Sequence, residues 1–194
     1  AYAGSYGVRL DVVDAGHRQA TAERLLVLGG VENPLRVTPV FASGEECYAA
    51  FRIPSIVRAL NGDLVAFAEG RVESASDSTA TIRIVSKVSQ DDGRTWGALH
   101  VVARNIVDGA EYAAMNPSPV VDTVRGTGRI VLVYKKLECS EWEIAQGHGV
   151  MRTFVIASDD HGQSWHGERD ITAQVHRPQP PDNWRIQVPT LGHA

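Results

Sequence analysis

The chain has 194 residues, of which 43% are hydrophobic and 22% are charged, a composition typical of a globular protein that buries a core. Its formal net charge of −4 argues against nucleic-acid binding, which usually depends on a basic face. No apolar run approaches the roughly 20 residues that are needed to cross a bilayer, so no membrane span is expected.

Cysteine and histidine usage gives no sign of a cross-linked or metal-dependent fold. Cys47 and Cys139 are the only two cysteines, and we interpret them as free thiols in preference to a disulfide. The seven histidines show no metal-ligand spacing, so neither a metal site nor another cofactor is expected. No signal peptide is predicted, because Ala1-Tyr2-Ala3 leads into polar sequence without an apolar segment.

Residues 1–47 are expected to form lead-in strands. The runs 8–13 and 24–28 are strand-like, and Pro34, Pro39 and Gly44 then interrupt the pattern. The sequence leaves open whether this segment closes the fold that follows or ends an accessory domain.

From residue 48 the pattern becomes regular. The apolar runs 53–60 and 63–68 flank Asn61-Gly62, a strong signal for a hairpin with a type I′ turn. A polar loop over 69–78, a third run over 79–88 and a fourth over 98–102 follow. The spacing predicts four antiparallel strands, which is typical of a propeller blade.

The same unit recurs further along the chain. Residues 117–122 and 129–134 are strand-like, and a polar loop over 135–149 separates them from the run 150–157 and a short strand at 169–172. The strands are apolar on both faces, as expected when sheets are covered on either side. No useful length of helical periodicity is present.

A repeated motif marks the end of the third strand in each unit. Its pattern is Ser, any residue, Asp, any residue, Gly, any residue, Thr or Ser, and Trp. Ser and Asp can bond nearby backbone N–H groups, and Gly tolerates positive φ, so the pattern predicts a hairpin turn. Two copies indicate a repeated supersecondary unit. The motif residues are Ser89, Asp91, Gly93 and Trp96, then Ser158, Asp160, Gly162 and Trp165.

This motif resembles the Asp box of sialidases and related β-propellers, in which it is structural. Phe51-Arg52-Ile53-Pro54, followed by Asp boxes, is similar to the N-terminal half of exo-α-sialidases. The resemblance covers about residues 48–194 and implies an all-β, six-bladed propeller. This chain would supply two blades and the start of a third, and the remaining blades would come from a longer chain or a companion polypeptide.

The resemblance also implies a set of site residues. Arg52 would be the first of three arginines that bind the sugar carboxylate, which suits a planar guanidinium that bonds a carboxylate bidentately. Arg71 would line the sugar site, and Asp77, in the loop that follows, would be the general acid/base. Met115 and Asn116 would contact the part of the sugar that carries O4 and the N-acetyl group.

Other parts of the expected site are less specific. Sialidases use a Tyr nucleophile assisted by Glu, and the resemblance places both beyond this chain. Three tyrosines are interpreted as packing residues: Tyr48, Tyr112 and Tyr134. Three residues of the 135–149 loop are candidates for the pocket rim: Glu138, Glu141 and Trp142. The stretch 184–194 is similar to the entry of a third blade, although Pro189 to His193 departs from the family pattern.

The resulting prediction is a retaining exo-α-sialidase that acts on terminal α-linked sialic acids of glycoconjugates. The alternatives are a non-catalytic sialic-acid-binding or other glycan-binding propeller, a trans-sialidase, and a propeller that acts on another sugar or serves as a scaffold. The expected partners are a sialylated glycan and the remaining blades, with no nucleic acid and no membrane span. The resemblance favours a secreted, cell-surface or periplasmic location.

Overall fold

The computed structural model describes residues 10–13, 19–22, 37–77, 81–177 and 182–189, and the chain divides into two compact units, residues 1–39 and 40–194. In the first unit, β1 (Leu10–Val13) and β2 (Gln19–Ala22) form an antiparallel pair. β1 confirms residues 10–13 of the strand expected over residues 8–13, whereas residues 8–9 and the run 24–28 lie outside the described residues. The sequence-based boundary after residue 47 stays a prediction.

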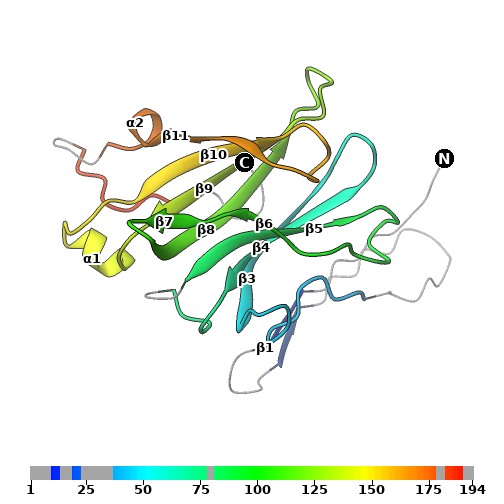
Figure 1. The fold of residues 1–194 in the computed structure, drawn as a ribbon, viewed down its shortest axis with the longest axis horizontal. Helices are drawn as coiled ribbons and strands as arrows, with labels where there is room; N and C mark the ends of the chain where they lie inside the picture. The colour runs from blue at the N-terminus through cyan, green and yellow to red at the C-terminus, as the bar shows by residue number, and fades with distance from the viewer. Residues whose placement is uncertain (1–9, 14–18, 23–36, 78–80, 178–181, 190–194) are drawn as a thin grey trace. The chain divides into compact units, whose positions relative to one another are not determined.

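The first four-strand sheet consists of β3 (Ala50–Arg58), β4 (Leu64–Arg71), β5 (Ile82–Ser89) and β6 (His100–Ala103). Consecutive strands pair antiparallel, as the sequence predicted (Figure 1). One boundary was wrong. The polar loop expected from residue 69 begins only after Arg71, because β4 continues through Glu69 and Arg71 with both side chains buried.

The turn between β3 and β4 also differs from the expected type I′ geometry. Ala59 O accepts a hydrogen bond from Gly62 N at 2.9 Å, and Ala59 N donates to Asp63 O at 2.8 Å. Gly62 has φ 96°, but Asn61 keeps negative φ and accepts a hydrogen bond from Asp63 N through its side-chain Oδ1. This is a type I turn followed by a left-handed glycine. The Asn side chain stabilises it locally.

The second four-strand sheet repeats the arrangement with β8 (Ala110–Val121), β9 (Ile130–Leu137), β10 (Arg152–Ser158) and β11 (His166–Asp170). Its consecutive strands are again antiparallel, and the short β7 (Asn105–Val107) pairs with β8. The polar loop expected from residue 135 begins later, because β9 continues to Leu137. A single parallel bridge between Ile82 and Ala113 joins the two sheets in the order β11-β10-β9-β8-β5-β4-β3.

The described residues include two short helices. α1 (Glu141–Ala145) starts in the loop after β9, and α2 (Thr172–Val175) follows β11 where the sequence had predicted the end of a strand. Ser140 caps α1: its Oγ accepts a hydrogen bond from Glu143 N at 3.2 Å, and the Glu143 carboxylate accepts one from Ser140 N at 2.9 Å. This capping box was visible in the sequence as Ser-x-x-Glu, although the helix is too short to show a period.

The main core lies between the two four-strand sheets. It combines Val65 and Phe67 of β4 with Leu132 and Tyr134 of β9, all fully buried. The opposite face of the first sheet packs against Tyr48 and its neighbours. Each face of this sheet is therefore covered, which explains why its strands are apolar on both sides.

Both Asp boxes form closed local networks. In the first, Ser89 Oγ accepts a hydrogen bond from Gly93 N at 2.8 Å, and Asp91 Oδ1 accepts one from Thr95 N at 2.8 Å. In the second, Ser158 Oγ accepts one from Gly162 N at 2.8 Å, and the Asp160 carboxylate bonds the Ser164 backbone and hydroxyl. The expected hairpin turns are confirmed, with φ values of 80° and 89° at the two glycines.

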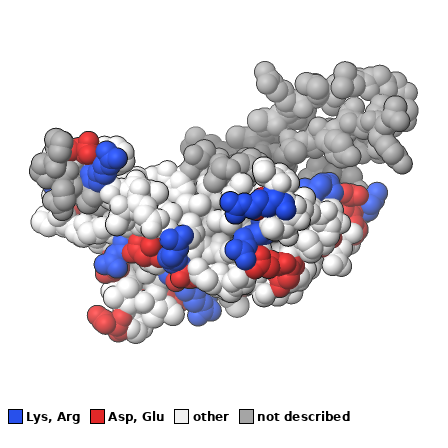
Figure 2. Space-filling model, turned by 90° about the horizontal axis from the view of Figure 1, so that it is seen from above, with Lys and Arg blue, Asp and Glu red and all other residues white. Residues whose placement is uncertain are grey.

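Charged side chains are mixed on the face drawn in Figure 2, where Lys and Arg lie beside Asp and Glu rather than in a patch of one sign. Cys47 and Cys139 are both free thiols. Within the described part of the chain, no helix is long and apolar enough to cross a membrane.

Candidate active site

Two irregularities in the sheets place Arg52 and Asn116. The β3–β4 register shifts between Arg52 and Ser55, and Ile53 has φ 53°. The β8–β9 register shifts between Met115 and Ser118, and Asn116 has φ 57°. Positive φ is strained for a β-branched residue such as Ile53, and strain of this kind collects at functional sites.

A hydrogen bond connects the two irregular segments. Ser55 Oγ donates a hydrogen bond to Pro117 O at 3.3 Å, so the distorted part of β3 contacts the distorted part of β8. β-bulges re-aim side chains and commonly lie next to active sites. This contact holds together residues that are far apart in the sequence.

Arg71 is the fully buried centre of the site. Its Nη2 donates to Glu69 Oε2 and to Asp77 Oδ1, and its Nη1 donates to Ala75 O at 2.8 Å. Gly70 separates Arg71 from Glu69 in β4, so the two charged side chains share one face of the strand. The guanidinium is thus fixed by three acceptors.

Gly70 is required by close packing on the other face of β4. A Cβ atom there would lie 2.6 Å from Cε1 of Tyr48. Tyr48 therefore acts as a packing residue, as the sequence predicted, and it presses against the strand that carries Glu69 and Arg71.

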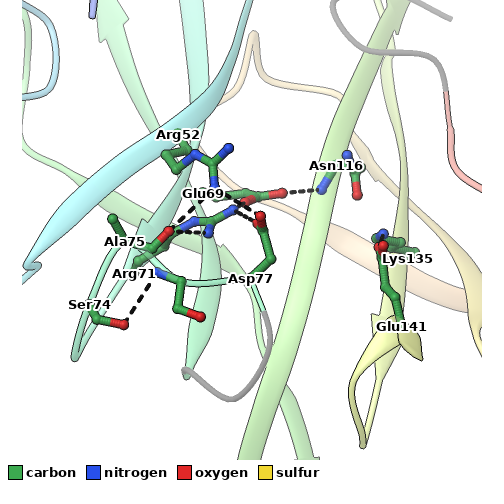
Figure 3. Close-up of polar contacts among 10 residues, drawn as sticks. Arg52, Glu69, Arg71, Ser74, Ala75, Asp77, Asn116, Lys135 and Glu141 are labelled. Atoms are coloured by element: carbon green, nitrogen blue, oxygen red, sulfur yellow. Dashed lines mark hydrogen bonds and ion pairs between the residues drawn. The ribbon is translucent and has the colours of Figure 1, made fainter. Parts of the chain in front are cut away.

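Asp77 and Arg52 form the open edge of the site. Asp77 Oδ2 lies 2.9 Å from Arg52 Nη1, and its other oxygen bonds Arg71 (Figure 3). The side chains of Arg52 and Asp77 are 43% and 54% exposed, whereas Arg71 is fully buried. The structure therefore brings together the three residues that the sequence singled out as carboxylate binder, site-lining arginine and acid/base.

Glu69 is a site residue that sequence reasoning missed. The sequence pattern placed it at the start of a polar loop, yet its buried carboxylate bonds Arg71 and accepts a hydrogen bond from Asn116 N at 2.8 Å. It therefore joins the arginine cluster to the irregular part of β8. The available signal was strand alternation, which puts Glu69 on the same face as Arg71 and in register with Arg52.

The two carboxylates of the site have opposite electrostatic character. Burial raises the pKa of Glu69 above its usual range, although the Asn116 hydrogen bond and Arg71 partly offset the effect. For Asp77, burial also acts upward, but hydrogen bonds and charge from Arg71 and Arg52 outweigh it and lower the pKa. Asp77 is therefore held as a carboxylate while both guanidiniums contact it.

Met115 and Asn116 lie at the end of the cluster. Asn116 is only 7% exposed, and its Oδ1 is buried without a hydrogen-bond partner within the described residues. Met115 is buried in a small apolar cluster with Ile82, Leu137 and Met151. Packing thus explains the burial of Met115, whereas Asn116 Oδ1 remains a hydrogen-bond acceptor without a donor among the described residues.

The remaining candidate residues occupy different places. Tyr134 is buried, and its hydroxyl bonds Glu168, while Tyr112 is half-buried in β8. Glu141 forms an ion pair with Lys135, and Trp142 is exposed on α1. Residues 190–194 of the expected third-blade entry lie outside the described residues. Within the described ranges, no group of three or more His, Cys, Asp or Glu side chains could hold a metal ion.

Comparison with known proteins identifies related chains. Residues 62–194 match the model of the BNR repeat-like domain. Human sialidase-4 is 35% identical over 130 residues, covering 64% of this chain and 26% of the relative. The sialidase of Micromonospora viridifaciens is 29% identical over 188 residues, covering 94% of this chain and 28% of the relative. This chain therefore spans about a quarter of the length of these relatives.

Solved structures give the same fold. The Hadza microbial sialidase Hz136 superposes with a TM-score of 0.61 at 24% identity, covering 70% of this chain and 29% of that structure. The intramolecular trans-sialidase from Ruminococcus gnavus superposes with a TM-score of 0.59 at 13% identity, covering 76% and 53%. With the family match over most of its length, the chain belongs to the BNR-repeat, exo-α-sialidase family and covers part of the family's domain.

Proposed function

We propose that the whole protein is an exo-α-sialidase that hydrolyses terminal α-linked sialic acids with retention, through a six-bladed propeller. This chain would contribute the first two blades and the start of a third. The observation that carries the proposal is the convergence of an exposed guanidinium, Arg52, and a buried one, Arg71, on the exposed carboxylate of Asp77. Such a cluster suits a small anionic sugar.

Arg52 is proposed to bind the carboxylate of the substrate. Half its side chain is accessible, and its present partner is the exposed carboxylate of Asp77, which an incoming carboxylate can replace. Arg71 is already bound by Glu69 and Ala75 O, so it provides a fixed positive charge that lines the site. The substrate would thus exchange one carboxylate for another at Arg52.

This exchange prepares Asp77 for acid catalysis. While both arginines contact Asp77, their hydrogen bonds and charge lower the pKa of its carboxyl and disfavour the protonated form. Loss of Arg52 removes one cation and raises that pKa. Protonated Asp77 then gives its proton to the glycosidic oxygen as the bond to the sugar breaks, and the resulting carboxylate later takes a proton from the attacking water.

The nucleophilic step is proposed to use residues beyond this chain. Tyr48 and Tyr134 are buried in packing positions, and Tyr112 does not belong to the cluster. The Tyr nucleophile, its Glu and two further arginines would come from other blades, which belong to a longer chain or a companion polypeptide. The site residues of this chain supply carboxylate recognition and acid/base chemistry.

The test is hydrolysis by the whole protein of two sialosides, one with a sugar leaving group and one with an activated aryl leaving group. Asp77→Asn is expected to lower kcat on the sugar-linked substrate by roughly 10²–10⁴-fold, the usual contribution of general acid catalysis. The aryl substrate should lose much less, since its leaving group needs little protonation. Equal losses on both substrates would contradict the acid role of Asp77.

Product analysis separates the alternatives. Released free sialic acid supports the sialidase, a sialylated acceptor supports a trans-sialidase, and binding without turnover supports a glycan-binding propeller. Retention is checked by the anomer that nuclear magnetic resonance detects first. An inverted first product would overturn the proposed mechanism.

A further inference from the structure

A buried lysine lies beside the candidate site and has no part in the proposed mechanism. The side chain of Lys135 is only 2% exposed, and its ammonium forms an ion pair with Glu141, which is 43% exposed in the first turn of α1. Burying an ammonium is unfavourable unless it is paired. The lysine of this pair is therefore shielded from solvent, whereas the glutamate is accessible to it.

Strand register and the close-up view place this pair beside the irregular part of β8 that carries Asn116 (Figure 3). Lys135 pairs with Met115 of β8 on one side and with Thr153 of β10 on the other, so the three side chains lie in one row on one face. Gln187 donates a hydrogen bond to Thr153 Oγ1 at the end of this row. The row is polar except for Met115, and Asn116 follows Met115 directly.

Asn116 supplies an independent sign that a ligand belongs here. Its backbone N donates to Glu69, but its buried Oδ1 accepts no hydrogen bond from any described residue. A buried acceptor without a donor is unfavourable, so such atoms call for an explanation. In Figure 3 the Asn116 side chain lies between the guanidinium cluster and the Lys135–Glu141 pair.

We propose that Asn116, Lys135 and Glu141 form a polar subsite that selects a hydroxyl-bearing ring substituent of the sugar over an acetyl group. The proposal rests on the proposed function, because the sugar is the one whose carboxylate Arg52 binds. Asn116 Oδ1 and Glu141 accept hydrogen bonds and the Lys135 ammonium donates them. A hydroxyl both donates and accepts hydrogen bonds, so it satisfies both kinds of group. The methyl end of an acetyl group does neither; it only covers the ammonium and removes its solvation.

The test measures binding, so that it does not depend on turnover. Calorimetry on the whole protein gives Kd for three free sialic acids that differ only in one ring substituent: acetamido, hydroxyacetamido or hydroxyl. The wild type is expected to bind at least one hydroxyl-bearing acid more tightly than the acetamido acid. The preference is expressed as the Kd of the acetamido acid divided by the Kd of the hydroxyl-bearing acid. Lys135→Met should reduce this Kd ratio about tenfold, the scale of a hydrogen bond to a charged group.

Lys136→Met is the matched control. Lys136 lies on the same strand but on the opposite face, and its ammonium pairs with Glu168 at 2.8 Å and lies 4.4 Å from the Phe154 ring centroid. The same substitution there removes a similar ion pair and should leave the Kd ratio unchanged. Lys135→Arg, which keeps the charge, should retain most of the preference.

A second variant protects the test against misfolding. Glu141 is half exposed, so Glu141→Gln should fold, as thermal melting will show, and it should lower the same ratio. If the wild type shows no preference, or if both Lys135→Met and Glu141→Gln leave the ratio unchanged, this inference alone is wrong. If the wild type binds none of the three acids, the proposed function fails with it.

Discussion

The two Asp boxes have the same internal hydrogen bonds but different surroundings. In the first box, a Cβ on Gly93 would meet Leu64 Cδ1 of the neighbouring hairpin at 3.5 Å, an ordinary contact. In the second, a Cβ on Gly162 would meet Val65 Cγ1 at 2.9 Å, and the Trp165 ring packs edge-on against Phe67 with centroids 5.5 Å apart. The first box closes its own sheet, and the second also joins one sheet to the next.

This difference shows how a repeat acquires a second role. Hydrogen bonds within an eight-residue turn need only the motif residues, so both copies form them. Packing against Val65 and Phe67 depends on what lies beside the turn, and Trp165 of the second copy packs against the main core. The motif therefore predicts that the turn forms. How much each turn stabilises the fold depends on what packs against it.

The largest expected effect comes from Gly162→Ala. The left-handed φ costs about 1–2 kcal/mol for a residue with a Cβ, and overpacking against Val65 adds about 1–3 kcal/mol. Gly93→Ala should lose only the first amount, since a Cβ there would make only ordinary van der Waals contacts. Urea unfolding of the two variants measures the difference. Equal losses would show that the contact with Val65 adds nothing.

Trp165→Ala comes next, with an expected loss of about 2–3 kcal/mol, because the indole packs on the main core but is partly exposed. Trp96→Ala should cost roughly half as much, since Trp96 is not part of that core cluster. Thermal unfolding followed by circular dichroism compares them. A larger loss at Trp96 would reverse the assignment of the inter-sheet role to the second box.

A pH effect tests what the boxes share. Hydrogen bonds from the Thr95 side chain and backbone lower the pKa of Asp91 to about 2; burial opposes the shift at Asp160, but bonds from Ser164 and Ser158 prevail and lower its pKa to about 2. A lowered native pKa stabilises the fold above the unfolded value of 3.8, and this stabilisation is lost as pH falls through about 2.

The double variant Asp91→Asn, Asp160→Asn should therefore lose less stability than the wild type between about pH 5 and pH 2. Melting temperatures at several pH values in that window provide the measurement. Single variants should share the effect about equally, because the two networks match. An unchanged acid transition in the double variant would mean that the box carboxylates do not contribute.

The smallest expected effect on stability is that of Asp77→Asn, below about 1 kcal/mol, because its ion pair with Arg52 is exposed and the buried Arg71 keeps Glu69 as its anionic partner. This carboxylate contrasts with those of the Asp boxes, which bond their own turn. Asp77 bonds two arginines from β3 and β4, and one of these is accessible. A stability loss as large as that of Gly162→Ala would indicate a structural role in place of the proposed catalytic one.

Local sequence patterns predicted much of the fold. The Asp boxes, the hairpin at Asn61-Gly62 and two series of four antiparallel strands were all predicted, because turn chemistry and apolar alternation act over a few residues. The exact turn type and helix α1 were missed. One hydrogen bond from the Asn61 side chain and one capping box decided them, and neither leaves a periodic signal.

Sequence resemblance also selected Arg52, Arg71 and Asp77 as a candidate site, and the structure places these three in contact. It did not find Glu69, whose importance depends on a hydrogen bond from Asn116, or Lys135, which looked like an ordinary charged residue after a strand. Both are buried ionisable groups. Burial is a property of neighbouring strands and cannot be read from the residue itself.

By itself, the sequence determined the repeated turns, the strand order and the identity of the guanidinium and carboxylate groups. Only the tertiary structure decided that Glu69 links Arg71 to Asn116, that the second Asp box packs on the first sheet, and that Lys135 shares a face with Met115. The reason is physical: backbone turns are stabilised by groups a few residues apart, whereas burial and charge pairing depend on which strands the fold brings together.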